Sequence, residues 1–314
     1  MEFSFVCLPT KTSLLVSIAV LLSLLAPVAL QASPSVIVTD YATGAVLVAE
    51  DAETSKYPAS LTKLMTLYLL FEAVEEARVT LDQKFLVSTN AAQQPPTKLR
   101  LRPGTSITAA DCIDALILRS ANDVAVVVAE ALGGSESAFA ATMTRKAAQL
   151  GMTATAFRNA SGLPDEEQVV TARDLAVLAH ALIKRFPEYY PHFSLRTSRA
   201  AGKGITTHNN FLEIYAGADG LKTGYTRAAG YNLAASVARS GHRLIGVVLG
   251  EPNRRARDLK MIQIMNQAFT ALGVPPPHSG KKLAARASQR RHYRKHSSQA
   301  ALVPRRGARS SVLN

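Results

Sequence analysis

The sequence predicts a mixed α/β (α+β) domain in which an antiparallel sheet is flanked by helices, with a helical subdomain in the middle of the chain. Two groups of β-rich runs, one near residue 40 and one over residues 220–250, enclose a long stretch with helical periodicity. Short turns join the runs within each group, as expected for antiparallel neighbours. The 314 residues allow one such domain with extensions at its ends.

The first elements are a hairpin and a buried helix. Residues 35–40 and 45–49 are β-rich, and Gly44 between them suits a tight turn. Residues 60–77 follow Pro58 and form a largely apolar stretch without internal glycine or proline. We therefore expect a centrally buried helix there.

The middle of the chain is expected to be helical. Ser120–Asn122 separates the first two of these helices, and Thr171 is a suitable N-cap for the last one. The predicted ranges are residues 109–119, 123–132, 139–151 and 171–186.

The last part returns to strands and closes with a helix. Strands are predicted over residues 220–226, 231–238 and 243–250, followed by an amphipathic helix over residues 255–272. The helix carries an apolar stripe, which we interpret as core rather than as a cofactor site. Its residues are Met261, Ile264, Met265 and Phe269.

Residues 1–32 resemble a secretory signal peptide. An apolar run over residues 13–30 follows Lys11, and small residues around Ala32 fit a cleavage site. An uncleaved membrane anchor is the alternative, because the run is close to the length needed to span a bilayer. Either reading places residues 33–274, the predicted catalytic domain, outside the cytoplasm, in the periplasm or at the cell envelope.

The positive charge of the chain is concentrated in residues 275–314. Ten basic residues and no acidic residue lie there, so a net charge of +13 leaves only +3 for the rest. We expect a disordered basic tail, which either contacts an anionic membrane or envelope surface or only keeps the protein in solution. Nucleic-acid binding is not expected, because Tyr293 is the tail's only aromatic residue and the protein is predicted to be exported.

Cysteine content and motifs exclude several classes. The two cysteines are Cys7 and Cys112, and removal of the signal would leave one thiol, too few for an internal disulfide or a zinc site of four thiolates. The sequence has no GxxxxGK[ST] phosphate loop and no HExxH pattern. We expect neither a metal nor another cofactor.

Three short patterns carry the candidate chemistry: Ser60–Lys63, Ser120–Asn122 and Lys222–Gly224. Each alone is weak evidence, since such patterns occur by chance in helix caps, turns and exposed strands. Their contexts fit one site, however, because they fall at the start of a buried helix, in a loop between helices and on a predicted strand.

Ser60 and Lys63 are spaced to act as nucleophile and base. Residues three apart share a helix face, which brings the hydroxyl and the amine within hydrogen-bond reach. The amine accepts a proton only if burial and a nearby cation lower its pKa from about 10.4. Apolar neighbours and Lys222 offer both conditions.

The other two patterns have separate candidate roles. Ser120 is a candidate relay of a proton to a departing amine, and the amide of Asn122 would donate to a substrate carbonyl and accept from the base.

The strand pattern is expected to bind the substrate. Lys222 and Thr223 suit a substrate carboxylate, while Gly224 lets the backbone approach closely. The N–H groups of Ser60 and Tyr225 are then the predicted oxyanion hole.

With these motifs the chain resembles the serine-type D-alanyl-D-alanine carboxypeptidases, which are low-molecular-mass penicillin-binding proteins of the β-lactamase-like superfamily. The resemblance covers residues 35–250 and includes segments beyond the motifs. These segments are residues 57–66, 101–105, 120–123, 150–153, 159–163 and 219–226.

The resemblance implies a β-lactamase/transpeptidase-like fold and an acyl-enzyme cycle. Ser60 would attack the bond between the terminal D-alanines of a peptidoglycan stem pentapeptide, and β-lactams would acylate the same serine. Thr226 is implied to assist carboxylate binding. The chain departs from the pattern at Ala121, where many members have glycine, at residues 208–210, where some place an arginine, and after Leu272, where many continue into a second domain.

Other functions remain open at this stage. A class A-like β-lactamase needs a glutamate on a deacylating water, and residues 150–164 contain no acid, while Glu166 and Glu167 read as a solvated loop. A peptidoglycan DD-endopeptidase fits the same residues. A non-catalytic envelope-binding protein, held by its basic tail, is the alternative of another class.

Overall fold

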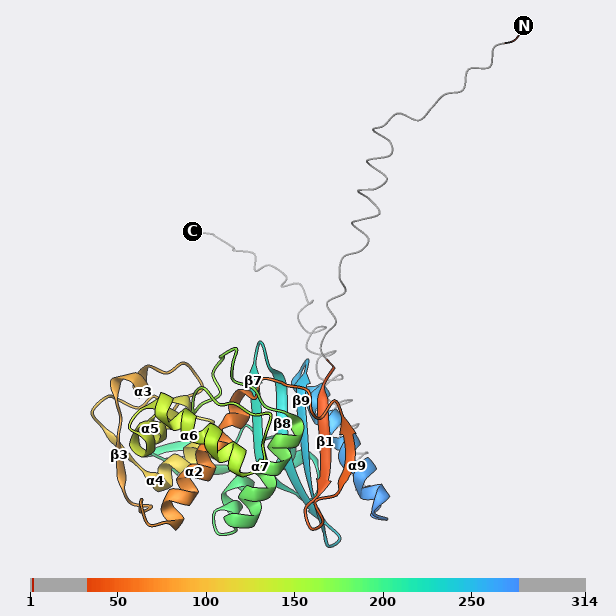
Figure 1. The fold of residues 1–314 in the computed structure, drawn as a ribbon. Coiled ribbons are helices and arrows are strands. Elements are labelled where there is room, and N and C mark those ends of the chain that lie inside the picture. Colours follow the sequence, from red (N-terminus) through yellow and green to blue (C-terminus); the bar gives the residue numbers. More distant parts are fainter. Residues whose placement is uncertain (1, 3–32, 277–314) are drawn as a thin grey trace, which may run out of the picture. The chain divides into compact units, whose positions relative to one another are not determined.

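A five-stranded antiparallel sheet lies at the centre of the computed structural model, which describes residue 2 and residues 33–276 (Figure 1). The order is β2-β1-β9-β8-β7, so the N-terminal hairpin extends the C-terminal strands and β7 is an edge strand. Ile37 pairs with Val247 where the two groups of strands meet. The strands are β1 (Ser35–Asp40), β2 (Val46–Glu50), β7 (Ala218–Thr226), β8 (Gly230–Arg239) and β9 (His242–Glu251).

Each face of the sheet is covered by helices. Val36 and Val38 face helix α9 (Arg254–Ala271), while Ile37 between them faces the side covered by α7 (Ala172–Arg185). This alternation follows from the two-residue period of a strand. The predicted stripe of α9 is confirmed as core, because Met261, Ile264, Met265 and Phe269 are all fully buried.

The helical subdomain lies beside the β7 end of the sheet (Figure 1). Its central helix α2 is buried from Lys63 to Ala73 and follows a short 3₁₀ turn, η1. A small sheet of β3 and β4 packs at its margin. The elements are η1 (Ala59–Thr62), α2 (Lys63–Glu75), β3 (Lys84–Leu86), α3 (Thr89–Gln93), β4 (Ser106–Thr108), α4 (Ala109–Asp114), η2 (Ala115–Arg119), α5 (Asn122–Gly133) and α6 (Glu136–Gln149).

The segment between α7 and β7 contains elements that the sequence patterns did not predict. A two-stranded hairpin of β5 and β6 stands between two short helical turns. The elements are η3 (Tyr190–Ser194), β5 (Thr197–Ala200), β6 (Lys203–Thr206) and α8 (Phe211–Ile214).

The predicted fold class is confirmed, with adjustments at element ends. The helix expected from Ser60 begins as the 3₁₀ turn η1 and becomes α-helical at Lys63. Residues 115–119 of the helix predicted over 109–119 form a π-helical turn instead. Thr171 caps α7 as expected, and its hydroxyl accepts a hydrogen bond from the Asp174 N–H at 3.0 Å.

Both predicted terminal segments fall largely outside the described residues. Of the signal, residues 1–32, only residue 2 is described, and of the basic tail only residues 275 and 276. Within residues 33–276, no single helix has the length and apolarity to cross a membrane. The pair α5 and α6 has the composition but is bent by 82°.

Candidate functional site

Ser60 lies in the η1 turn, and hydrogen bonds from the central sheet hold the residues just before it in place. The side chain of Asn232 on β8 is fully buried, and its amide donates to the carbonyls of Tyr57 at 2.9 Å and Pro58 at 3.1 Å. Its oxygen accepts from the Gly250 N–H at 2.9 Å. One amide therefore ties the turn before the serine to two strands of the sheet.

Lys63 extends from the next helical turn toward Ser60. Its Nζ lies 3.4 Å from the Ser60 Oγ, 2.7 Å from Asn122 Oδ1 and 2.5 Å from the Ser161 carbonyl oxygen. The residue is fully buried. The predicted spacing thus places the hydroxyl and the amine within hydrogen-bond range.

The surroundings favour the neutral form of this amine. Burial first, and then the positive charge of Lys222, lowers the pKa of Lys63 well below its ordinary value, against the opposing pull of Asp123 and Glu136. A neutral amine has two N–H bonds and one lone pair. The two carbonyl oxygens use the N–H bonds, which leaves the lone pair for the hydroxyl of Ser60.

The loop of residues 159–162 supplies one of those carbonyls. Asn159 Oδ1 accepts from the N–H groups of Ser161 at 3.2 Å and Gly162 at 2.7 Å, and Thr66 Oγ1 donates to the Ala160 carbonyl at 2.7 Å. Gly162 has φ +83°, and a Cβ added there would lie 1.8 Å from the Ala59 carbonyl oxygen. Only glycine allows this close approach.

Ser120 and Asn122 lie where η2 ends and α5 begins. Ser120 adopts a left-handed backbone with φ 58°, and its Oγ is buried without a hydrogen-bond partner among the described residues. The Asn122 side chain donates one N–H to the Pro95 carbonyl at 2.9 Å while its oxygen accepts from Lys63. Strain and an unpaired hydroxyl at one place are typical of functional sites.

Strand β7 passes directly along the serine turn. A Cβ added at Gly224 would meet the Ser60 nitrogen and the Pro58 carbonyl oxygen, both at 3.1 Å. Lys222 lies two residues before Gly224 on the same strand. Burial and the charge of Arg257 lower the pKa of Lys222 to about 7. Glycine therefore lets the strand bring this lysine to the site.

The remaining residues predicted on this strand have different surroundings. Thr223 is buried, whereas the Tyr225 side chain is 55% exposed and its ring lies 4.3 Å from that of Tyr231. The Thr226 hydroxyl accepts a hydrogen bond from the Ala229 N–H at 3.0 Å.

Further cations gather near Lys222. Burial and the charges of Lys222, Arg119 and Arg254 lower the pKa of His208 to about 4, so this histidine is neutral at pH 7. The His208 N–H donates to the Leu118 carbonyl at 3.3 Å, next to Arg119 in the chain. Arg119 and Arg254 therefore lie near residues 208–210, where some members of the family have an arginine.

The structure joins the three predicted patterns in one region. Direct contacts link Ser60, Lys63 and Asn122, and Gly224 lies against the serine turn. Sequence reasoning missed residues that support this site because they act through backbone carbonyls or across long chain separations. They are Glu136, Ser161, Asn232, Arg119, Arg254 and Arg257.

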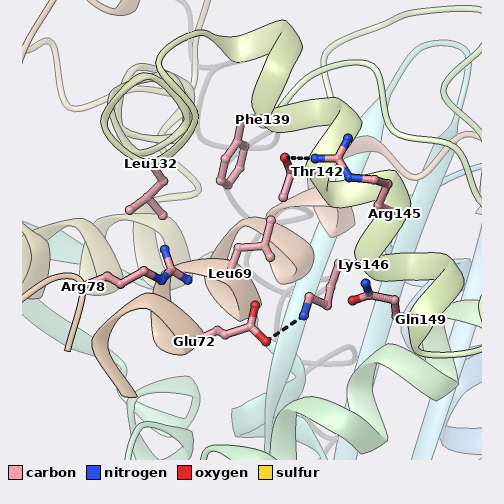
Figure 2. A pocket seen from close by; sticks show the side chains of 9 residues that line it. All are labelled: Leu69, Glu72, Arg78, Leu132, Phe139, Thr142, Arg145, Lys146 and Gln149. Atoms are coloured by element: carbon pink, nitrogen blue, oxygen red, sulfur yellow. Dashed lines mark hydrogen bonds and ion pairs between the residues drawn. The ribbon is translucent and has the colours of Figure 1, made fainter. Parts of the chain in front are cut away.

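Two of the pockets in the described part of the chain differ in their relation to the site. A groove of about 390 Å³ is lined by the serine turn, the loop after Gly162 and the β7–β8 turn. Another, of about 220 Å³, lies between α2, α5 and α6, where Lys146 pairs with Glu72 at 2.8 Å (Figure 2). It contains none of the predicted site residues.

The fold and the pairing of a half-buried serine with a fully buried lysine are typical of the penicillin-binding class of serine enzymes. A family model described as D-alanyl-D-alanine carboxypeptidase matches residues 25–253. The chain therefore belongs to the D-alanyl-D-alanine carboxypeptidase family, which confirms the resemblance seen in the motifs.

Individual relatives agree with this assignment. The chain is 36% identical over 244 residues to the D-alanyl-D-alanine carboxypeptidase DacC of Escherichia coli (strain K12), covering 74% of this chain and 60% of DacC. It is 31% identical over 257 residues to DacF of Bacillus subtilis (strain 168), covering 80% of this chain and 66% of DacF. This chain therefore spans less than two thirds of either relative.

A solved structure shows the same fold. The crystal structure of Penicillin-Binding Protein D2 from Listeria monocytogenes in the ampicillin bound form matches with a TM-score of 0.66 and 31% identity. The match covers 75% of this chain and 96% of that chain.

Proposed function

We propose that this protein is a serine-type, penicillin-sensitive D-alanyl-D-alanine carboxypeptidase that removes the last D-alanine from peptidoglycan stem pentapeptides. The observation that carries the proposal is the fully buried Lys63 amine, 3.4 Å from the Ser60 hydroxyl and bound through its N–H groups to two carbonyl oxygens. This arrangement supports a neutral base aimed at a nucleophile. Membership of the carboxypeptidase family supports the choice of reaction.

The first half of the cycle forms the acyl-enzyme. Ser60 Oγ attacks the carbonyl carbon between the two D-alanines, and its proton passes to Lys63 Nζ. The N–H groups of Ser60 and Tyr225 stabilise the oxyanion. The C–N bond then breaks, and the departing amine receives a proton through the hydroxyl of Ser120, which has no other partner among the described residues.

The second half of the cycle releases the shortened peptide. Water attacks the ester carbonyl, and Lys63 takes the water proton and returns a proton to Ser60. Lys222 and Thr223, with the arginines near His208, attract the terminal carboxylate of the incoming peptide. A β-lactam offers a carboxylate and a strained amide to the same groups, which supports acylation by penicillins.

The two terminal segments support a location at the cell envelope. An apolar run over residues 13–30 supports export, and the basic residues 275–314 support contact with an anionic envelope surface. Cosedimentation with vesicles that contain anionic lipid, compared for the full chain and a chain ending at Pro277, tests this contact.

The decisive experiment measures D-alanine release from a stem pentapeptide. The wild-type protein should release one D-alanine per peptide and should be labelled covalently by fluorescent penicillin. Ser60→Ala should abolish both, with an unchanged melting temperature as evidence of folding. Release at the wild-type rate by Ser60→Ala would refute the assigned nucleophile, and cleavage of crosslinked dimers without D-alanine release would favour an endopeptidase.

A further inference from the structure

Residues 158–162, which contain the carbonyl that binds Lys63, belong to no helix or strand. The N–H groups of this segment are all bound by side-chain oxygens rather than by backbone carbonyls. Gln168 accepts from residues 158 and 159, Glu136 accepts from residue 160, and Asn159 accepts from residues 161 and 162. Because no backbone ladder fixes the segment, its position depends on these side chains.

Glu136 is the acceptor that comes from another element. Gln168 and Asn159 lie at most 10 residues from the N–H groups that they bind. Glu136 is the first residue of α6, and its Oε1 accepts from the Ala160 N–H at 3.0 Å, across 24 residues of chain. This hydrogen bond therefore attaches the segment to the helical subdomain.

Ala160 is held on both sides of its α-carbon. Its N–H is bound by Glu136 on α6, and its carbonyl accepts from Thr66 Oγ1 on α2 at 2.7 Å. Ala160 and Thr66 are both fully buried. The next carbonyl along the chain is that of Ser161, 2.5 Å from Lys63 Nζ. Glu136 therefore fixes the residue next to an oxygen that binds the base.

The carboxylate of Glu136 is half-buried and forms no ion pair within residues 33–276. Burial raises its pKa, the Ala160 N–H opposes this effect, and the charge of Glu130 on α5 raises the pKa further. The cation that lowers it is Lys63, the base itself. A half-buried carboxylate without a paired cation costs folding free energy. A role at the site accounts for this cost better than stability does.

We propose that Glu136 is a positioning residue for the base. By binding the Ala160 N–H, its carboxylate holds the Ser161 carbonyl against the amine of the lysine. Glu136 acts through the loop and has no part in binding the substrate. The inference rests on the proposed function, because the position of this carbonyl affects the reaction only if Lys63 takes the proton of the nucleophile.

Loss of this hold should slow proton transfer rather than weaken binding. The N–H bonds of the neutral amine are directed to the oxygens of Asn122 and Ser161, which leaves the lone pair for Ser60. If the Ser161 carbonyl moves, the amine turns with it and the lone pair no longer faces the hydroxyl. A misplacement of about 1 Å can cost up to about 100-fold in rate.

Thr144 provides a matched control on the same helix. Its Oγ1 accepts from the Phe157 N–H at 2.9 Å, so it also ties α6 to this part of the chain. Phe157 lies four residues before Ser161, outside the segment of residues 158–162. Thr144→Val removes this bond at nearly constant volume. It should therefore lower the melting temperature without slowing the reaction.

The test measures penicillin acylation by stopped flow, which separates the acylation rate constant k2 from the dissociation constant Kd of the initial complex. Glu136→Leu removes the acceptor and should lower k2 about tenfold or more, with Kd within about twofold of the wild type. Glu136→Gln keeps an oxygen for the Ala160 N–H and should keep k2 within about threefold. Loss of the charge does not remove the neutral amine, because Glu136 raises the pKa of Lys63. Thr144→Val should keep both constants.

Melting temperatures establish that the variants are folded. If Glu136→Leu does not fold, Glu136→Asp takes its place, because one methylene fewer withdraws the carboxylate from the Ala160 N–H and keeps the charge. Glu136→Asp should lower k2 and leave Kd unchanged.

The outcomes separate this inference from the proposed function. The inference would be overturned by a wild-type k2 in folded Glu136→Leu or Glu136→Asp, by a k2 in Glu136→Gln as low as in Glu136→Leu, or by an equal loss of k2 in Thr144→Val. The proposed function stands in each case, because the wild-type protein is still labelled at Ser60 and releases D-alanine. A wild-type protein that is neither labelled nor releases D-alanine would overturn the proposed function and this inference together.

Discussion

The α9 face of the sheet and the β7 edge are both buried but differ in chemistry. The first is an apolar core in which Val237 and Phe269 are fully buried. The second buries polar groups, among them Lys63, Lys222 and Asn232, each at most 2% exposed. Apolar burial stabilises a fold, whereas a buried amine costs folding free energy and has its pKa lowered as a result. Stability and reactivity are therefore concentrated in different parts of the molecule.

The largest expected effect is on reactivity at the β7 edge. Lys63→Met fills the same space but removes the proposed base, so penicillin acylation and D-alanine release should fall about 10²- to 10⁴-fold. The free energy of unfolding should change by no more than about 3 kcal/mol, because removal of a buried amine stabilises the fold while the oxygens of Asn122 and Ser161 lose their donor. Stopped-flow acylation and urea unfolding measure the two quantities.

Lys84 provides the control for this substitution. It is exposed on β3, so Lys84→Met should change neither acylation nor stability. Rapid acylation of Lys63→Met would mean that another group deprotonates the serine.

On the α9 face we expect a substitution to lower stability but to leave activity unchanged. Phe269 is fully buried and the guanidinium of Arg239 lies 4.0 Å from its ring centroid. Phe269→Ala should lower the free energy of unfolding by about 3–5 kcal/mol. At a temperature where the variant is folded, kcat/KM should stay within about twofold. A loss of activity from the folded variant would show that the two regions are coupled.

Asn232 tests the link between the two regions. Asn232→Leu leaves the carbonyls of Tyr57 and Pro58 without their donor, at an expected cost of about 1–3 kcal/mol. Because those carbonyls precede Ser60, acylation should slow as well, by about tenfold. Unfolding and acylation are measured on the same preparation, and an unchanged acylation rate would show that the η1 turn holds its shape without this amide.

The smallest expected effect is a pH dependence. Burial and the charge of Lys222 lower the pKa of Lys63, the proposed base, so raising the pH does not remove its neutral form. Lys222, with a pKa of about 7, is charged below pH 7 and loses its charge above it. The second-order rate of penicillin acylation should therefore drop roughly fivefold from pH 7 to pH 8. A rate that rises over this interval would contradict the carboxylate-binding role of Lys222.

Much of the difference between the α9 face and the β7 edge can be predicted from local sequence. The stripe from Met261 to Phe269 predicted the α9 core because a helix repeats every 3.6 residues, and the strands were predicted from β-rich runs and turns. The contact of Ser60 with Lys63 follows from the same helical geometry. These features depend on neighbours along the chain, which a single sequence displays.

The rest depends on contacts between distant segments. The Ser161 carbonyl that binds Lys63 is backbone, and every residue has one, so no residue type marks it. Asn232 reaches the turn before Ser60 from 174 or more residues away in the chain. The hairpin of residues 197–206 is short and carries few apolar side chains, so its strands lack a clear alternating pattern.

If β-lactams acylate Ser60 as we propose, the close approach at Gly162 limits how this protein could become resistant to them. Any larger residue there would push the loop off the Ala59 carbonyl and carry the Ser161 carbonyl away from the amine of Lys63. A mutant that widened the site in this way to evade a drug would disable the base needed for its own substrate. Selection with the antibiotic should therefore leave this glycine unchanged and favour substitutions along the groove walls.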